Sequence, residues 1–338
     1  MIDLRSDTVT KPPLAMREAI AAAEVGDDVF EEDPTVQRLE QAAAERLGKE
    51  AGLLTASGTM GNLVALLTHA SPGDEVILEA DSHIFNYEAG GAARVAGLMP
   101  RLVSGRRGTF DSKQLAAVLR PDNIHFPPTT LVCMENTHNA SGGSVLDQPT
   151  VQETAAYARE RGLALHLDGA RIFNAAAAAD VEPAELCEPF DSVMFCLSKG
   201  LAAPVGSVLV GSRGFIQKAR QRRKLLGGGM RQAGVIAAAG IYALEVMAKR
   251  LTEDHRRARC LADALTGLGL TVMNEVATNI INIRLSGDLS AYALLSAWRS
   301  AGVAALPRDE KNIRLVLHYE ISDDDVTAAV AALAQILG

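Results

Sequence analysis

The chain has 338 residues, of which 48 % are hydrophobic and 22 % charged, the composition of a globular protein with a sizeable core. The net charge of −8 argues against nucleic acid or an anionic membrane surface as a partner. Four cysteines without Cys-x-x-Cys spacing predict neither disulfides nor a zinc site. We find no secretory signal and no apolar run of membrane-spanning length, so we expect a cytoplasmic protein.

The N-terminal part of the chain is predicted to be extended and then helical. Residues 1–13 are polar and end in Lys11-Pro12-Pro13, where the prolines exclude an earlier helix start. A segment this short frays unless it docks on the rest of the protein. The apolar spacing then predicts helices over 14–24 and 35–47.

A short strand over 52–55 leads into the small-residue run 56–62, and a helix is predicted over 63–69. Small residues between a strand and a helix leave backbone N–H groups free to bind an anion, helped by the helix dipole. The run lacks the Gly-x-Gly-x-x-Gly and Gly-Lys-Ser/Thr patterns, so neither a Rossmann nor a P-loop site is predicted. Gly58 and Thr59 are the candidates for holding a phosphate group.

Two histidines lie near predicted strands. The strand 75–78 ends just before His83, where an imidazole can stack on a flat ring or act as an acid or base, although it can also be an ordinary loop histidine. His125 lies in a loop without a strong signal, upstream of a strand predicted over 130–135. Position therefore favours His83 as a functional residue.

Two apolar runs of strand length each stop at a charged residue beside glycine. The first run delivers Asp168, with Arg171 just beyond it, and the second delivers Lys199. The separation of 199 − 168 = 31 positions leaves room for one crossover helix between parallel neighbouring strands. A pyridoxal phosphate (PLP) enzyme needs this pair, because the lysine forms the Schiff base and the carboxylate pairs with the pyridinium nitrogen.

Each residue of this pair has an ordinary alternative interpretation. A lone Asp or Lys at a strand end is usually a solvated group, so the pair and the phosphate loop together carry the PLP prediction. His166 lies on the same strand face as Asp168. A hydrogen-bonded core histidine is the favoured interpretation of His166, with support of Asp168 as the alternative.

The C-terminal part alternates between strands and helices. After an antiparallel strand over 206–211 and a flexible glycine run at 227–229, a long helix from about residue 236 leads out of the large domain. Strands over 280–285 and 313–319 and helices over 291–301 and 322–336 follow. Arg314 lies on the non-core face of its strand, where it is either a surface charge or a bidentate partner for a substrate carboxylate.

These elements predict an α/β protein with more than one domain. Because 338 residues exceed the usual size of one domain, we expect an extended segment (1–13), a large domain (14–240) and a small C-terminal α/β domain (241–338).

Six motifs in this order resemble those of the low-specificity L-threonine aldolases, PLP enzymes of fold type I in the aspartate aminotransferase superfamily. The motifs are Leu4-Arg5-Ser6-Asp7-Thr8-Val9-Thr10, Ser57-Gly58-Thr59-Met60-Gly61-Asn62, Glu135-Asn136-Thr137-His138-Asn139, Leu167-Asp168-Gly169-Ala170-Arg171, Leu197-Ser198-Lys199-Gly200 and Gly227-Gly228-Gly229-Met230-Arg231-Gln232. The resemblance implies a large domain with a mostly parallel seven-stranded sheet flanked by helices. It also implies pyridoxal 5′-phosphate as cofactor and a homo-oligomer, either a dimer or a dimer of dimers, with active sites at the interface.

The resemblance also implies a role for each site residue. Lys199 forms the Schiff base, Asp168 pairs with the pyridine nitrogen, and His83 stacks on the ring. Gly58 and Thr59 hold the phosphate. The remaining implied groups are Ser6, Arg171 and Arg314 for the substrate carboxylate, Arg171 also beside the cofactor, His125 for the β-hydroxyl, and Lys224 and Arg231 for a phosphate across a subunit boundary.

The implied reaction is cleavage of L-threonine, L-allo-threonine or another β-hydroxy-α-amino acid to glycine and an aldehyde such as acetaldehyde. The base that removes the β-hydroxyl proton is left open among His83, His125 and an ordered water. Two other functions remain as alternatives: a β-eliminating amino-acid lyase on the same fold, and a non-catalytic module that binds a phosphate ligand. No metal site is predicted.

Overall fold

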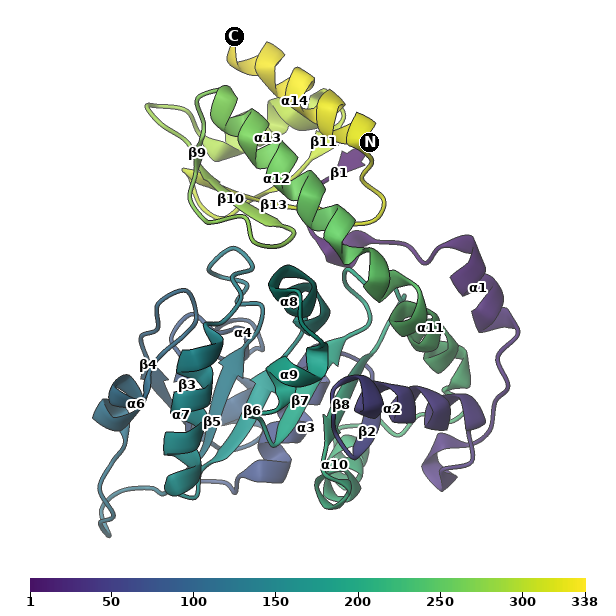
Figure 1. The fold of residues 1–338 in the computed structure, drawn as a ribbon, viewed down its shortest axis with the longest axis vertical. Helices are drawn as coiled ribbons and strands as arrows, with labels where there is room; N and C mark the ends of the chain where they lie inside the picture. Colours follow the sequence, from purple (N-terminus) through teal and green to yellow (C-terminus); the bar gives the residue numbers. More distant parts are fainter.

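The computed structural model describes all residues, 1–338, and its central element is a seven-stranded sheet (Figure 1). The strands, in spatial order, are β2 (Ala51–Thr55), β8 (Ser207–Gly211), β7 (Ser192–Cys196), β6 (Ala164–Asp168), β5 (Thr129–Glu135), β3 (Glu75–Glu79) and β4 (Met99–Val103). Strand β8 is antiparallel to both of its neighbours, and all other pairs are parallel. The predicted mostly parallel seven-stranded sheet, with 206–211 as its antiparallel member, is confirmed.

Helices cover both faces of this sheet, as the alternation of buried side chains along the strands requires. The helices against one face, with the largest core cluster, are α2 (Pro34–Arg46), α7 (Gln148–Glu160), α8 (Ile172–Ala179), α9 (Pro183–Cys187) and α11 (Gly234–Glu245). The other face is covered mainly by α3 (Gly58–His69) and α10 (Arg213–Leu225), with short helices α4 (His83–Asn86) and α5 (Gly91–Arg94) beside them. Two remaining helices, α1 (Leu14–Ala21) and α6 (Ser112–Val118), lie at the margins.

The helix predicted over 63–69 begins earlier, at Gly58. The side-chain oxygen of Ser57 accepts a hydrogen bond from the backbone N–H of Met60 at 3.2 Å and caps the helix there. The small-residue run is therefore the first turn of α3 rather than a loop before it. The free N–H groups of the helix N-terminus still lie at the carboxyl end of β2.

The small C-terminal domain has its own sheet and core. Its four antiparallel strands, in spatial order, are β12 (Leu306–Pro307), β13 (Asn312–Val316), β10 (Ile280–Arg284) and β9 (Thr271–Val272). The helices α12 (Leu251–Gly267), α13 (Ala291–Ser300) and α14 (Asp323–Leu337) bury a cluster that includes the fully buried Trp298. The strand predicted over 313–319 ends at Val316, after which the backbone N–H of Leu317 bonds outside the sheet, to Asn279.

The N-terminal segment docks between the two parts of the molecule instead of fraying. Strand β1 (Ile2–Asp3) pairs in parallel with β11 (Val303–Ala304) of the small domain, and Leu4 belongs to the small-domain core. Figure 1 shows this segment passing from the small domain toward α1 on the large one. The boundaries at 13/14 and 240/241 stay a prediction, and the core cluster of the large sheet continues to Leu251.

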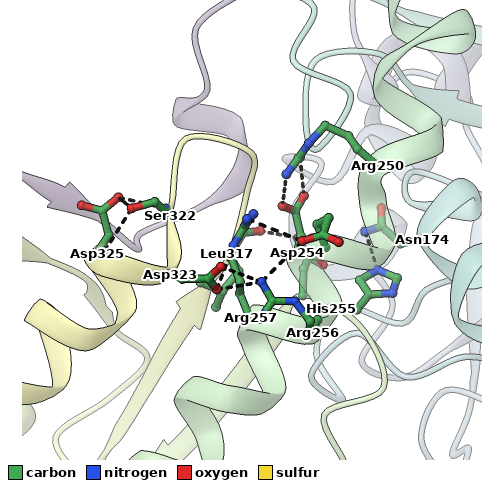
Figure 2. Close-up of polar contacts among 12 residues, drawn as sticks. Asn174, Arg250, Asp254, His255, Arg256, Arg257, Leu317, Ser322, Asp323 and Asp325 are labelled. Carbon is green, nitrogen blue, oxygen red and sulfur yellow. Dashed lines mark hydrogen bonds and ion pairs between the residues drawn. The ribbon is translucent and has the colours of Figure 1, made fainter.

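Polar contacts around α12 hold the two parts together (Figure 2). The side-chain amide of Asn174 on α8 donates to Nε2 of His255 on α12 at 3.1 Å. Burial lowers the pKa of His255 to about 4, so the ring is neutral and can accept this bond. Arg250 forms a two-bond ion pair with the buried Asp254 one turn further along α12. None of the helices in the molecule is long and apolar enough to cross a membrane.

Candidate active site

The carboxyl ends of β6 and β7 bring the predicted acid and amine to neighbouring positions. Asp168 is the last residue of β6 and is paired with Met194 of β7, five residues before Lys199. The strand adjacency expected from the 31-residue spacing is therefore present. Asp168 is buried, whereas Lys199 is half-exposed.

A buried cluster surrounds the carboxylate of Asp168. The side-chain amide of Asn62 donates to Oδ2 of Asp168 at 2.9 Å and to Oε1 of Glu88 at 2.8 Å. Nδ1 of His83 lies 3.0 Å from the same Glu88 oxygen. Burial lowers the pKa of His83, but the hydrogen bond with Glu88 and the charge of Asp168 outweigh it and raise this pKa. His83 therefore approaches Asp168 with Nδ1 occupied and Nε2 free of a protein partner.

A second cluster, at the junction of the two domains, is built around Asp7. Its fully buried carboxylate accepts hydrogen bonds from Nε and Nη2 of Arg171 at 2.7 and 2.8 Å. Burial alone would raise the pKa of Asp7, but the charge and hydrogen bonds of Arg171 hold it far below its usual range. The pairing uses two of the three guanidinium nitrogens, so Nη1 of Arg171 remains available to a carboxylate.

Arg314 reaches the same region from β13. Its Nη1 donates to Oδ1 of Asn139 at 3.0 Å, and burial and the neighbouring charge of Arg171 lower the pKa of Arg314. Arg171 pairs with Asp7, whereas Arg314 has no ion pair with a protein carboxylate and only feels the charge of Asp7. The surplus positive charge suits an anionic group of a bound molecule, and the two arginines come from the two different domains.

The ammonium group of Lys199 is close enough to both clusters for its charge to act on each. Burial and the hydrogen-bonded partners have the larger effects on the pKa values of Asp7 and His83. The charge of Lys199 adds a smaller effect that lowers each of them. The backbone carbonyl of Lys199 accepts a hydrogen bond from the hydroxyl of Thr10 at 3.1 Å. The N-terminal segment is therefore fixed directly against the lysine.

The N-terminus of α3 forms a close-fitting cup beside the two strands. A Cβ placed on Gly58 would lie 2.8 Å from Sγ of Cys196 at the end of β7, so only glycine allows this approach. Thr59 is exposed, and the first backbone N–H groups of the helix have no helical acceptor. A phosphorylated ring fits this set of donors, with a phosphate at the helix N-terminus and a pyridine nitrogen at Asp168.

Ser6 lies next to Asp7 and is buried. Its hydroxyl oxygen accepts hydrogen bonds from the backbone N–H and the hydroxyl of Thr8 at 3.2 and 2.8 Å. The hydroxyl hydrogen of Ser6 has no protein acceptor and can be donated to a ligand.

Three residues implied by the resemblance form no hydrogen bond with the residues of this site within one chain. His125 is exposed and precedes β5, whereas Asp168 adjoins the last residue of β5, Glu135, so the strand of about 20 Å separates them. Lys224 is exposed on the last turn of α10. Arg231 is exposed and donates to Asp27 at 2.9 Å.

Sequence reasoning did not single out several residues that organise the site: the buried Asp7, Asn62, Glu88 and Glu135, and the half-buried Asn139. Glu135 accepts hydrogen bonds from the backbone N–H groups of His83 (2.6 Å) and Asn139 (2.8 Å), so it positions one residue of each cluster. All except Glu88 lie inside the six motifs, so their place in a motif was the signal that could have identified them as site residues. For Glu88 no pattern in the sequence marks its role.

Comparison with known proteins agrees with this geometry. Residues 3–287 match the family model described as "Beta-eliminating lyase". The chain is 46 % identical to "Low specificity L-threonine aldolase" of Escherichia coli (strain K12), with 98 % of each chain covered. It is 45 % identical to "Probable low-specificity L-threonine aldolase 2" of Arabidopsis thaliana, over 99 % of this chain and 97 % of that protein. The chain belongs to the low-specificity L-threonine aldolases.

Solved structures with low sequence identity show the same fold as this member of the threonine aldolases. A Leishmania major threonine aldolase superposes with a TM-score of 0.86 at 18 % identity and full coverage of both chains. A structure of SPT with PLP superposes with a TM-score of 0.78 at 19 % identity, over 99 % of this chain and 86 % of that one. The fold is that of PLP fold type I, and the chain is a PLP-dependent lyase.

Proposed function

We propose that the residues described above carry out the retro-aldol cleavage of L-threonine, L-allo-threonine and other β-hydroxy-α-amino acids to glycine and an aldehyde. The observation that carries the assignment of roles is that the charge of Lys199 acts on both clusters, that of Asp168 with His83 and that of Asp7 with the two arginines. An amino acid whose amine takes the place of the Lys199 amine would direct its carboxylate to Arg171 and Arg314. Ser6 would donate its free hydroxyl hydrogen to the same carboxylate.

Binding by two arginines fixes the orientation of the substrate around its Cα atom. PLP, when bound, supplies a sink for the electrons of the broken Cα–Cβ bond. Gly58 and Thr59 would hold its phosphate, and Asp168 would keep a negative charge at its pyridine nitrogen. With the carboxylate held by Arg171 and Arg314, the Cα–Cβ bond would be the one aligned with this electron sink and therefore the one that breaks.

The free Nε2 of His83 is our candidate for accepting the β-hydroxyl proton, directly or through a water. Loss of that proton and rupture of Cα–Cβ release the aldehyde, and protonation at Cα leaves glycine. The pairing of Nδ1 with Glu88 fixes which nitrogen faces the substrate. A base in this position typically contributes about 10²–10⁴-fold to the rate.

We also propose that the enzyme works as a homo-oligomer, a dimer or a dimer of dimers. His125, Lys224 and Arg231 would take their expected roles in the site of a neighbouring copy, since none of them bonds to a residue of its own site and strand β5 separates His125 from Asp168. All three are exposed, as such a contact requires. A cytoplasmic location is part of this proposal, and four cysteines that remain free thiols support a reducing compartment.

Product analysis with L-threonine tests the function. We expect acetaldehyde and glycine from both L-threonine and L-allo-threonine, and no product from the Lys199→Ala variant. Formation of 2-oxobutyrate and ammonia would instead identify a β-eliminating lyase. The absence of visible cofactor absorbance and of both product pairs would leave a non-catalytic binding module.

A further inference from the structure

A continuous line of hydrogen bonds runs from the side of the sheet to the carboxylate of Asp168. Nε2 of His69, on the last turn of α3, lies 2.7 Å from Oγ of Ser192 at the start of β7. The same oxygen lies 2.8 Å from Nδ1 of His166 on β6. Nε2 of His166 lies 3.1 Å from Oδ1 of Asn62, whose amide nitrogen bonds to Asp168.

The positions of the hydrogens along this line follow from the orientation of the Asn62 side-chain amide. Asp168 and Glu88 can both accept from Asn62, and the Asn62 amide nitrogen has two hydrogens to donate. Oδ1 of Asn62 therefore faces His166 and must accept from its Nε2–H. In a neutral imidazole the other nitrogen, Nδ1, is then an acceptor and takes the hydroxyl hydrogen of Ser192. Ser192 in turn accepts from Nε2–H of His69.

We propose that His69, Ser192, His166 and Asn62 form a one-way donor chain that ends on Asp168 and holds its carboxylate in place, as an acceptor, for the pyridine nitrogen of PLP. His166 and Asn62 are positioning residues in this arrangement, since they act through Asp168. The function of His166 is thus the support of Asp168, the second of the two interpretations that the sequence left open. The inference rests on PLP binding at Asp168 and is independent of which amino acid is cleaved.

Burial supports a chain of neutral groups. His166, Ser192 and Asn62 are each fully buried, so a positive charge on His166 would have no solvent to stabilise it. Burial lowers the pKa of His166 to about 3, and that of His69 to about 4. His69 also stacks on Phe215 with ring centroids 4.4 Å apart, which fixes the outer end of the chain.

Two substitutions of His166 separate positioning from packing. Gln places an amide nitrogen near the position of Nε2 and keeps a donor toward Asn62, whereas Leu fills the space without one. We expect His166→Leu to weaken the affinity of the PLP-free protein for PLP about tenfold, because the buried amide oxygen of Asn62 loses its donor and Asn62 is no longer held toward Asp168. His166→Gln should stay within about threefold of the original protein, because it keeps that bond.

A control variant and a direct measurement complete the experiment. Thr154→Ala removes another fully buried hydroxyl, which donates to the backbone carbonyl of Phe110 and takes no part in the donor chain to Asp168. This variant should leave PLP affinity unchanged. Nitrogen-15 NMR of the histidine rings in the PLP-bound protein should show His166 neutral with its hydrogen on Nε2. In Ser192→Ala the hydrogen should stay on Nε2 of His166, because its acceptor, Oδ1 of Asn62, is unchanged.

Several results would overturn the proposal. Equal PLP affinity in the Leu and Gln variants, a hydrogen on Nδ1 of His166 in the original protein, or a hydrogen on Nδ1 in Ser192→Ala would each do so. The NMR measurement decides even if His166→Leu does not fold. A protein that binds PLP but yields no aldehyde would contradict the proposed cleavage and leave this inference standing.

Discussion

Asp7 is a fully buried carboxylate whose neighbours are cations. Its substitution measures how much the buried ion pair with Arg171 stabilises the protein, and an exposed ion pair serves as the comparison. In Asp7→Ala the buried guanidinium of Arg171 would lose its partner, so we expect the free energy of unfolding to fall by about 3–5 kcal/mol. We also expect KM for threonine to rise, since Arg171 is no longer oriented. Urea unfolding and steady-state kinetics measure the two effects.

Asp3→Ala is the matched control for Asp7→Ala. Asp3 also pairs with an arginine of the same segment, Arg5, but that pair is partly exposed. We expect it to cost less than about 1 kcal/mol and to leave KM unchanged. Equal effects of the two substitutions would contradict the account of Asp7.

Arg314 offers a test of carboxylate binding from the small domain. We expect Arg314→Ala to raise KM for threonine and to lower kcat, because the carboxylate would be held by Arg171 alone and the Cα–Cβ bond would lose its orientation. Arg314→Lys should recover only part of this loss, since Lys lacks the planar two-nitrogen geometry. A KM equal to that of the original enzyme in Arg314→Ala would place the carboxylate elsewhere.

At the scale of the elements, the first turn of α3 depends on a residue without a side chain. The methyl group of Gly58→Ala would press on Cys196 and on Cε of Met194, 3.3 Å away, and would move the helix N-terminus from β7. We expect PLP affinity to fall roughly tenfold, which corresponds to about 1.4 kcal/mol. Equilibrium titration of the PLP-free protein with PLP measures it.

Gly214→Ala controls for the general effect of adding a methyl group near a helix start. Gly214 lies in the first turn of α10, and no atom comes within 4 Å of the position of its Cβ. We expect unchanged PLP affinity in this variant. A loss as large as that in Gly58→Ala would show that the cup is not the cause.

The elements and their order were largely predictable because apolar runs of strand length and glycine-bounded ends are local signals. The start of α3 was not, since the cap by Ser57 looks the same in sequence as a loop. Strand β4 also escaped prediction: Met99 and Leu102 on it are exposed, so it lacks the buried alternation that marks a strand. Within the site, Asp168 and Lys199 were predictable from strand ends, whereas Glu88 was not, because only folding brings it to His83.

At the scale of the whole molecule, buried neutral histidines make stability depend on pH. Burial lowers the pKa of His166 to about 3 and those of His69 and His255 to about 4. Below pH 6.5 the unfolded chain binds more protons at these sites than the folded protein, so the free energy of unfolding falls as pH drops toward the folded values. The pKa values of His83 and His138 are raised in the folded protein, so these two residues add stability as the pH falls, fully below pH 6.5, and offset part of this fall.

Urea unfolding at pH 7 and pH 5 checks this dependence. For His166 alone, the shift corresponds to a loss of about 2 kcal/mol between the two values. We expect His166→Gln to reduce the measured pH dependence by that amount. His125→Gln, at an exposed position, should leave the pH dependence unchanged. A reduced pH dependence in His125→Gln together with an unchanged one in His166→Gln would contradict the assignment.

The pairing of β1 with β11 also restricts when the enzyme can mature during its synthesis. Ile2 is in register with Val303, 301 positions later, and Asp7 and Thr10 follow directly on the same segment. Because the ribosome makes the chain from its N-terminus, the first residues wait unpaired until Val303 and Ala304 have emerged. Catalytic competence is therefore gained only after β11 has been made, however early the large sheet has formed.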